Sequence, residues 1–193
     1  MQKKIPKKST GKLRIIGGTW RSRQLPVIAQ DGLRPTTDRV RETLFNWLQS
    51  DIPAARCLDV FAGSGALGFE AASRGAEQVV MLEQSAAACK VLNTNINILQ
   101  TQKIQCIQTD ALRWLPAQTE KFDIVFIDPP YASQLLAETC QLLEQYSILA
   151  DNALIYLEQN SKQALPPLPS NWQLLKQKKA GQIGYYLAKR EPI

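Results

Sequence analysis

The sequence contains no histidine. This absence excludes the Ser-His and Cys-His nucleophilic mechanisms, so any proton transfer must use a carboxylate, a lysine, a tyrosine or water. No apolar run approaches the roughly 20 residues that a membrane-spanning helix needs. The basic N-terminus is not followed by the apolar segment of a secretory signal. We therefore expect a cytoplasmic protein that does not associate with membranes.

Cysteines are few and widely separated. None of the four belongs to a C-x-x-C pair (Cys57, Cys89, Cys106 and Cys140). A zinc site would need all four thiolates to converge from distant parts of the chain. Three of them lie in apolar sequence, so we interpret them as buried small side chains and expect no metal.

Acidic residues are scarce at the start of the chain. Residues 1–41 contain eleven Lys or Arg and two acids, a net charge of +9, whereas the remainder sums to −3. This asymmetry is typical of a protein with a polyphosphate partner. For residues 1–10, a solvated tail and an RNA-binding arm remain equally open. Farther on, apolar residues interleave with the cations, so we expect a folded surface in which Arg21, Arg23 and Arg39 bind substrate.

The patterning beyond residue 11 predicts alternating strands and helices. Residues 11–27 resemble a β-hairpin with its turn at Gly17-Gly18. Strands are predicted at 57–61, 78–82, 104–108, 122–127, 153–157, 172–178 and 184–189. Helices are predicted from a cap at Thr36 or Thr37 to about 49, and at 66–73, 85–99, 111–115 and 135–146. The alternation indicates an α/β fold with a parallel sheet covered on both faces, closed by an antiparallel final pair.

A glycine-rich turn follows the first of the strands after residue 56. Gly63 to Gly68 matches G-x-G-x-x-G between a strand and a helix, and Glu83 ends the next strand. Such glycines let a ligand approach the backbone, while the acid can accept hydrogen bonds from ribose hydroxyls. The pattern fits any adenosine cofactor and does not by itself separate NAD from S-adenosylmethionine. Asp59 favours the latter, because a carboxylate there would repel a pyrophosphate but attract an ammonium group. Asp110 can accept from an adenine amino group or cap the helix that follows it.

Asp128-Pro129-Pro130-Tyr131 follows the apolar strand at 122–127. An aromatic amine is a poor nucleophile, and two acceptors near its hydrogens can aim its lone pair at a methyl sulfonium. The Asp128 carboxylate and the Pro129 carbonyl can provide these acceptors, since successive prolines fix the turn. Tyr131 can stack on the target base. An ordinary strand-ending turn is the alternative, which the aromatic residue and the upstream glycine turn disfavour.

Together these residues resemble the class I S-adenosylmethionine-dependent methyltransferases. The blocks at 34–48, 59–68 and 128–131 are similar to the RsmD family of bacterial 16S rRNA guanine-N2 methyltransferases, and the similarity covers nearly the whole chain. The resemblance implies a Rossmann-like, seven-stranded, mostly parallel sheet in the order 3-2-1-4-5-7-6 with strand 7 antiparallel. It implies a basic extension at 1–33 and a methyltransferase domain at 34–193. It also implies methylation of one guanine in 16S rRNA, within the small subunit or an assembly intermediate, by a monomer.

The resemblance also implies site roles. Asp59, Gly63 and Gly65 would line the methionine part of the cofactor, with Phe61 and Ala111 beside it. Glu83 would bind the ribose and Asp110 the adenine. The base pocket would contain Asp128, Pro129, Pro130 and Tyr131, and Arg34 and Thr36 would form a lid.

Three alternatives remain at this stage. A DNA amino-methyltransferase would need a target-recognition domain, for which 193 residues leave little room. An NAD-dependent oxidoreductase has only the glycine turn in its favour. A non-catalytic RNA-binding module would not need Glu83, Asp110 and Asp128 together. Residue chemistry alone does not choose guanine over adenine or cytosine, since all three carry exocyclic amines.

Overall fold

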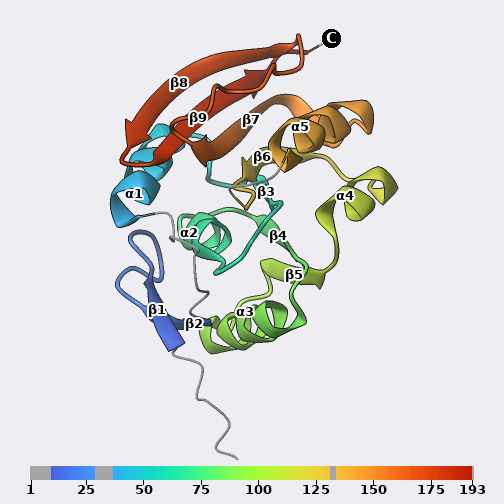
Figure 1. The fold of residues 1–193 in the computed structure, drawn as a ribbon. Coiled ribbons are helices and arrows are strands. Elements are labelled where there is room, and N and C mark those ends of the chain that lie inside the picture. The colour runs from blue at the N-terminus through green and yellow to red at the C-terminus, as the bar shows by residue number, and fades with distance from the viewer. Residues whose placement is uncertain (1–9, 29–36, 131–133, 193) are drawn as a thin grey trace, which may run out of the picture.

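The computed structural model of the chain describes residues 10–28, 37–130 and 134–192. Its large sheet has seven strands in the order β5-β4-β3-β6-β7-β9-β8 (Figure 1). The strands are β3 (Arg56–Asp59), β4 (Gln78–Glu83), β5 (Ile104–Gln108), β6 (Phe122–Ile127), β7 (Leu149–Asn160), β8 (Trp172–Ala180) and β9 (Ile183–Arg190). Numbered along the chain within this sheet, the order is 3-2-1-4-5-7-6. The last strand alone runs against the others, which confirms the predicted topology.

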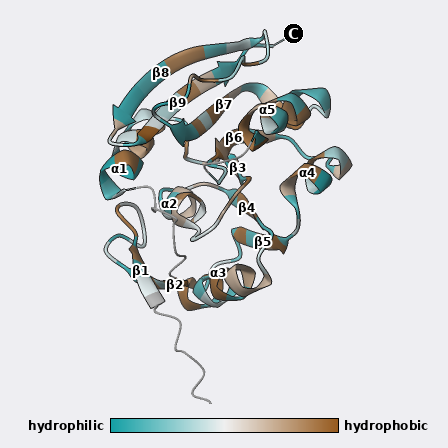
Figure 2. Ribbon diagram, in the orientation of Figure 1, coloured by the Kyte–Doolittle hydropathy of each residue, from teal (hydrophilic) through white to brown (hydrophobic). Residues whose placement is uncertain are grey.

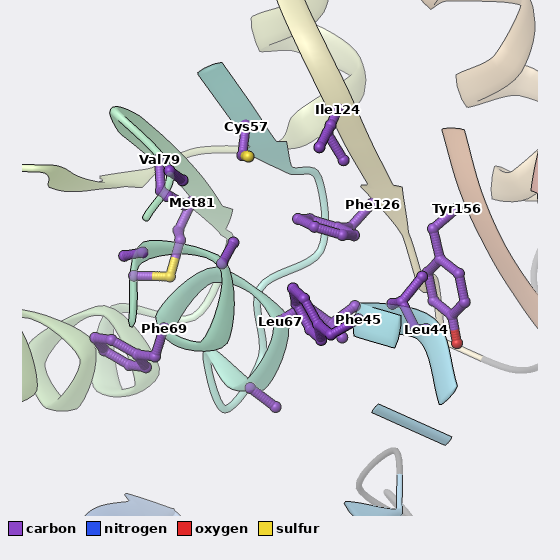
Figure 3. Packing of buried hydrophobic residues seen from close by; sticks show 14 of the residues in the cluster. Leu44, Phe45, Cys57, Leu67, Phe69, Val79, Met81, Ile124, Phe126 and Tyr156 are labelled. Atoms are coloured by element: carbon purple, nitrogen blue, oxygen red, sulfur yellow. The ribbon is translucent and has the colours of Figure 1, made fainter. Parts of the chain in front are cut away.

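Helices cover both faces of the sheet, as predicted. One face carries α1 (Asp38–Trp47), α2 (Ala66–Ser73) and α3 (Ala86–Leu99); the other carries α4 (Ala111–Trp114), a 3-10 turn at Leu115–Ala117 and α5 (Leu135–Gln145). Figure 3 shows the first layer, where the rings of Phe45 and Phe126 lie 5.9 Å apart. In the part of the chain described, no helix has the length and apolar character to cross a membrane.

Local sequence sets several of the helix ends. The Thr37 hydroxyl accepts from the Val40 amide at 3.4 Å, and the Ser85 hydroxyl accepts from the Ala88 amide at 3.3 Å. Both residues therefore act as N-caps. Gly75, with φ of +105°, follows α2 in the left-handed conformation that glycine adopts at little cost.

Tertiary pairing lengthens β7 beyond the predicted 153–157. The polar pair Asp151 and Asn152 interrupts the apolar pattern, yet β6 pairs with the strand as far as Leu149. On the other side β9 pairs with it as far as Asn160. Neighbouring strands, rather than side-chain periodicity, set its ends. Of the cysteines, Cys57, Cys89 and Cys140 are buried and Cys106 is partly buried.

The N-terminal hairpin packs against the sheet-covering helices. Strands β1 (Thr10–Arg14) and β2 (Gln24–Ile28) pair antiparallel, and their connecting loop contacts the end of α2. The amides of Ile16 and Gly17 each donate to the Glu70 carboxylate at 2.8 Å. A Cβ on Gly18 would lie 1.8 Å from the Ser73 carbonyl oxygen, so the loop can approach α2 because this residue is glycine. The predicted boundary between residues 33 and 34 lies outside the described residues.

A buried charge network joins the hairpin, α1 and α2. Arg41 is only 2 % exposed, and its guanidinium donates to the Arg14 carbonyl at 3.0 Å and to Asp38 at 2.6 Å. Glu70 is fully buried and accepts from Arg74 at 2.7 Å. The sequence analysis counted Arg14 and Arg41 among the eleven cations of residues 1–41. The structure buries Arg41 in this network, whereas Arg14 stays exposed and pairs with Asp38 at 3.0 Å at the surface.

Candidate active site

A pocket of about 580 Å³ opens at the carboxyl edge of the parallel strands. This is the edge where α/β sheets place their ligands, because the strand order reverses beside β3. Nine of the residues predicted from the sequence line the pocket: Asp59, Phe61, Gly63, Glu83, Asp110, Ala111, Asp128, Pro129 and Pro130. The tertiary structure therefore brings the glycine turn, the strand-end acids and the Asp128 turn to one cavity.

The glycine turn is held by the acid that was predicted to bind a ribose. The Glu83 carboxylate accepts from the Gly63 amide at 2.9 Å through Oε2 and from the Ser85 amide at 2.7 Å through Oε1. A carboxylate has about four acceptor sites, so both oxygens retain capacity for hydroxyl donors. Glu83 thus fixes the turn as well as facing the pocket, a structural role that the sequence analysis missed.

Gly65 lies beneath the pocket and does not line it. Its φ of +77° is left-handed, and a Cβ there would lie 2.5 Å from Phe69 and 2.7 Å from Leu92. Gly68, one helical turn later, would place a Cβ 2.6 Å from the Met81 sulfur. These two glycines let α2 pack closely on the sheet and on α3, while Gly63 provides the open backbone at the pocket wall.

Asp59 is an almost fully buried acid, 1 % exposed, at the end of β3. Its Oδ2 atom accepts from the Gly68 amide at 3.1 Å. Burial raises the pKa of its carboxyl to about 7, and the charge of Glu83 adds to that effect, whereas the Gly68 amide opposes it. A cation in the pocket would favour the ionised form. Asp59 is therefore a group whose charge state depends on what occupies the cavity.

Asp110 combines the two roles that the sequence left open. It is the N-cap of α4, and its Oδ1 atom accepts from the Leu112 amide at 2.9 Å. It also lines the pocket, so the second oxygen can accept from a ligand amine. The capping role is shown, and the contact with adenine remains a prediction.

The Asp128 turn directly follows β6, next to β3. The Val60 amide donates to the Phe126 carbonyl at 3.0 Å, which holds the ends of these central strands together. Pro129 is buried, Asp128 is partly buried and Pro130 is exposed. Tyr131 lies outside the described residues, as do the predicted lid residues Arg34 and Thr36.

The hairpin supplies a pocket wall that the sequence analysis missed. Gly11, Lys12, Val27 and Ile28 all line the cavity. The buried Asn95 amide of α3 donates to the Pro26 carbonyl at 2.9 Å, which fixes β2 over α3. Nothing in the periodicity of residues 11–28 indicates this contact, because it depends on tertiary docking.

The three predicted substrate arginines do not line the pocket. Arg21 and Arg23 are exposed in the hairpin loop, which packs at the C-terminal end of α2, opposite the pocket. Arg39 is exposed in the first turn of α1. Any substrate contact they make would lie away from the cavity itself.

The pocket is strongly acidic. Four carboxylates line it (Asp59, Glu83, Asp110 and Asp128), and Lys12 is the single cation among the lining residues described. This balance favours a cationic ligand and disfavours a pyrophosphate. Across residues 10–28, 37–130 and 134–192, no group of three or more His, Cys, Asp or Glu side chains is arranged to hold a metal ion.

Comparison with known proteins finds close relatives over the whole fold. The family model described as conserved hypothetical protein 95 matches residues 13–189. Ribosomal RNA small subunit methyltransferase D of Escherichia coli is 48 % identical over 98 % of this chain and 96 % of its own length. The solved structure of yhhF from Escherichia coli is 48 % identical, has a TM-score of 0.87 and covers 94 % of this chain and 99 % of that one. The structure of SMU.776 complexed with SAH shares the fold, with 15 % identity, a TM-score of 0.70 and coverage of 98 % of this chain and 58 % of that one.

Proposed function

Because this chain belongs to the family of ribosomal RNA small subunit methyltransferase D, we propose that it transfers a methyl group from S-adenosylmethionine to the N2 amino group of a guanine in 16S rRNA. The family assignment confirms the resemblance inferred from the sequence. The name of the relatives supports small-subunit rRNA as the substrate class. The guanine N2 specificity rests on the sequence resemblance.

The convergence of the Asp128 turn with the acid-lined glycine-turn pocket is the observation that carries the proposal. S-adenosylmethionine supplies the methyl group on a sulfonium and also carries an ammonium group, so it suits a cavity with four carboxylates. Glu83 would accept from the ribose hydroxyls, Asp110 from the adenine amine and Asp59 from the ammonium. Gly63, Phe61 and Ala111 would contact the cofactor through close packing.

At the other end of the pocket, the Asp128 carboxylate and the Pro129 carbonyl would accept from the target amine. These acceptors orient the nitrogen lone pair toward the methyl donor and stabilise positive charge that develops on the nitrogen. Removal of the proton after transfer is left to Asp128 or water, since the chain has no histidine. Tyr131 would stack on the base, and Arg34 and Thr36 would close over it.

The direct test is methylation of undermodified small subunits with labelled S-adenosylmethionine, followed by digestion to nucleosides. Label in N2-methylguanosine is expected. Label in a methylated adenosine or cytidine would retain an amino-methyltransferase but reject guanine N2. Calorimetry that shows binding of NAD and not of S-adenosylmethionine would reject the whole proposal.

The role of Asp128 is tested by Asp128→Ala. We expect turnover to fall by about 100-fold or more, because an acceptor at the reacting amine is lost. The affinity for S-adenosylmethionine should stay within about threefold, since the cofactor contacts lie elsewhere in the pocket. Asp51→Ala, at an exposed acid away from the pocket, is the matched control. Turnover that is equal in the two variants would remove Asp128 from the chemistry.

A further inference from the structure

A second basic surface lies at the outer edge of the sheet, on the last strand pair. β8 is an edge strand, seen at the top of Figure 1, and Figure 2 shows hydrophilic segments along it. Seven consecutive residues, 173–179, are exposed. Two of its lysines, Lys176 and Lys178, each place their Nζ atom 5.9 Å from the centre of the Trp47 ring of α1. We define Trp47, Lys176 and Lys178 as the edge surface.

The aromatic ring of this surface is fixed from below. Trp47 stacks on Tyr185 of β9 with a centroid distance of 5.4 Å and an interplanar angle of 25°. Tyr185 is 4 % exposed, so it belongs to the core and holds the indole in place. The two ammonium groups are thereby positioned over one rigid ring, as in cation-π pairs.

The charge of the edge surface is not neutralised within the described residues. Neither Lys176 nor Lys178 forms an ion pair with any acid in that part of the chain. Glu158, which faces Tyr185 across the sheet, is 1 % exposed and accepts from the Tyr156 hydroxyl at 2.7 Å. Two like charges therefore share one ring without an acid, an arrangement that a bound phosphate would stabilise.

Strand register places the edge surface level with the Asp128 turn. Lys178 faces Tyr185, and Tyr185 faces Glu158. Leu157, the residue before Glu158, faces Ile127 of β6. Asp128 therefore lies in the same row as Lys178. Three inter-strand spacings separate them, which amounts to about 14 Å.

We propose that the edge surface of Trp47, Lys176 and Lys178 binds the phosphate backbone of the RNA whose base enters the pocket. The proposal rests on the proposed function, and it adds an RNA-contact surface whose two lysines lie more than 130 positions beyond the basic N-terminal segment. RNA fits the two unneutralised cations at the sheet edge, and nucleotides next to the target base would reach a site about 14 Å from Asp128. Lysines on an edge strand also discourage strand pairing between molecules, so the test must separate the two roles.

The test compares two double variants in the full-length protein. Lys176→Gln with Lys178→Gln removes the edge charges. Lys103→Gln with Lys121→Gln removes two exposed lysines that directly precede β5 and β6, at the amino ends of the parallel strands and away from the pocket. The probe is 16S rRNA, with affinity measured from low to high salt. Loss of two phosphate contacts should make the fall of log affinity with log salt less steep, by about 1.5 in the slope. It should also weaken the affinity about thirtyfold at 0.1 M salt. KM for RNA should rise with kcat retained, and a Lys-to-Arg pair should restore binding.

Three outcomes would overturn the proposal. One is an equal salt slope in both double variants. Another is aggregation of the edge variant with unchanged RNA affinity, which would assign the lysines to protection of the edge strand. The third is normal binding of naked 16S rRNA with weaker binding of whole subunits, which would indicate a protein partner. Methylation by the unaltered protein, measured in the same experiment, tests the proposed function separately.

Discussion

Replacement of Asp59 by asparagine should make the ligand-free protein more stable at high pH and weaken its cofactor binding. Asparagine keeps an oxygen that can accept from the Gly68 amide, the bond that spans 3.1 Å in the structure. It removes the carboxyl, whose pKa burial raises from 3.8 to about 7. Between these two values the folded state retains a proton that the unfolded state has released. The Asp59 contribution to stability therefore falls as pH rises through this window.

The size of the effect follows from the two pKa values. Each pH unit within the window changes the free energy of unfolding by about 1.4 kcal/mol. Between pH 5 and pH 8 the original protein should lose about 3 kcal/mol relative to Asp59→Asn, with the change complete near the folded pKa of about 7. Other titrating groups are common to both proteins and cancel in the difference.

Urea unfolding of both proteins at pH 5 and pH 8, without ligand, measures this difference. The affinity for S-adenosylmethionine should fall at least tenfold in Asp59→Asn, because the carboxylate that we propose to pair with the ammonium group is lost. Calorimetry in buffers of different ionisation enthalpy should also show proton release when the original protein binds the cofactor near pH 7. A stability difference that is the same at both pH values would refute the raised pKa. Unchanged affinity would remove Asp59 from the cofactor site.

Two further predictions concern the scaffold of the pocket. Gly65→Ala should lower the free energy of unfolding by about 2–5 kcal/mol, because left-handed backbone strain adds to overpacking against Phe69 and Leu92. Gly63→Ala should lower it by only about 1–2 kcal/mol, the strain alone, because its Cβ would have no atom closer than 3.9 Å. Equal losses in urea unfolding would contradict the packing at Gly65. Glu70→Gln should lower the free energy of unfolding by about 3–5 kcal/mol, because it leaves the buried Arg41 without this carboxylate. The control is Glu120→Gln, whose ion pair with Arg56 has side chains 52 % and 34 % exposed, and it should lower the free energy of unfolding by under about 1 kcal/mol. A small loss at Glu70 would show that the network does not hold the hairpin.

The sequence located most of the cofactor pocket because its signals are local. Gly63, Glu83 and Asp110 each end or follow a strand, and parallel strands bring their carboxyl ends to one edge whatever lies between them. The strand order followed from the resemblance, and the structure agrees with it.

The hairpin wall depends on contacts between distant residues. The loop at Ile16 and Gly17 is fastened by Glu70, more than 50 positions away. Lys12 faces the pocket because β1 and β2 dock over α3, a contact that no periodicity in the hairpin encodes. The separation in sequence is larger still between Trp47 and the lysines that contact it, Lys176 and Lys178.

The charged residues also show which features the sequence determined and which features the tertiary structure decided. The sequence alone determined how many cations the first 41 residues carry, and it determined the turns and strand ends that carry the chemistry. Only the tertiary structure decided which cations face outward. It buries Arg41 beside Glu70, pairs Arg14 with Asp38 and leaves Lys176 and Lys178 over Trp47. The physical reason is that desolvation and ion pairing depend on neighbours in space, whereas a residue count records only which side chains a segment contains.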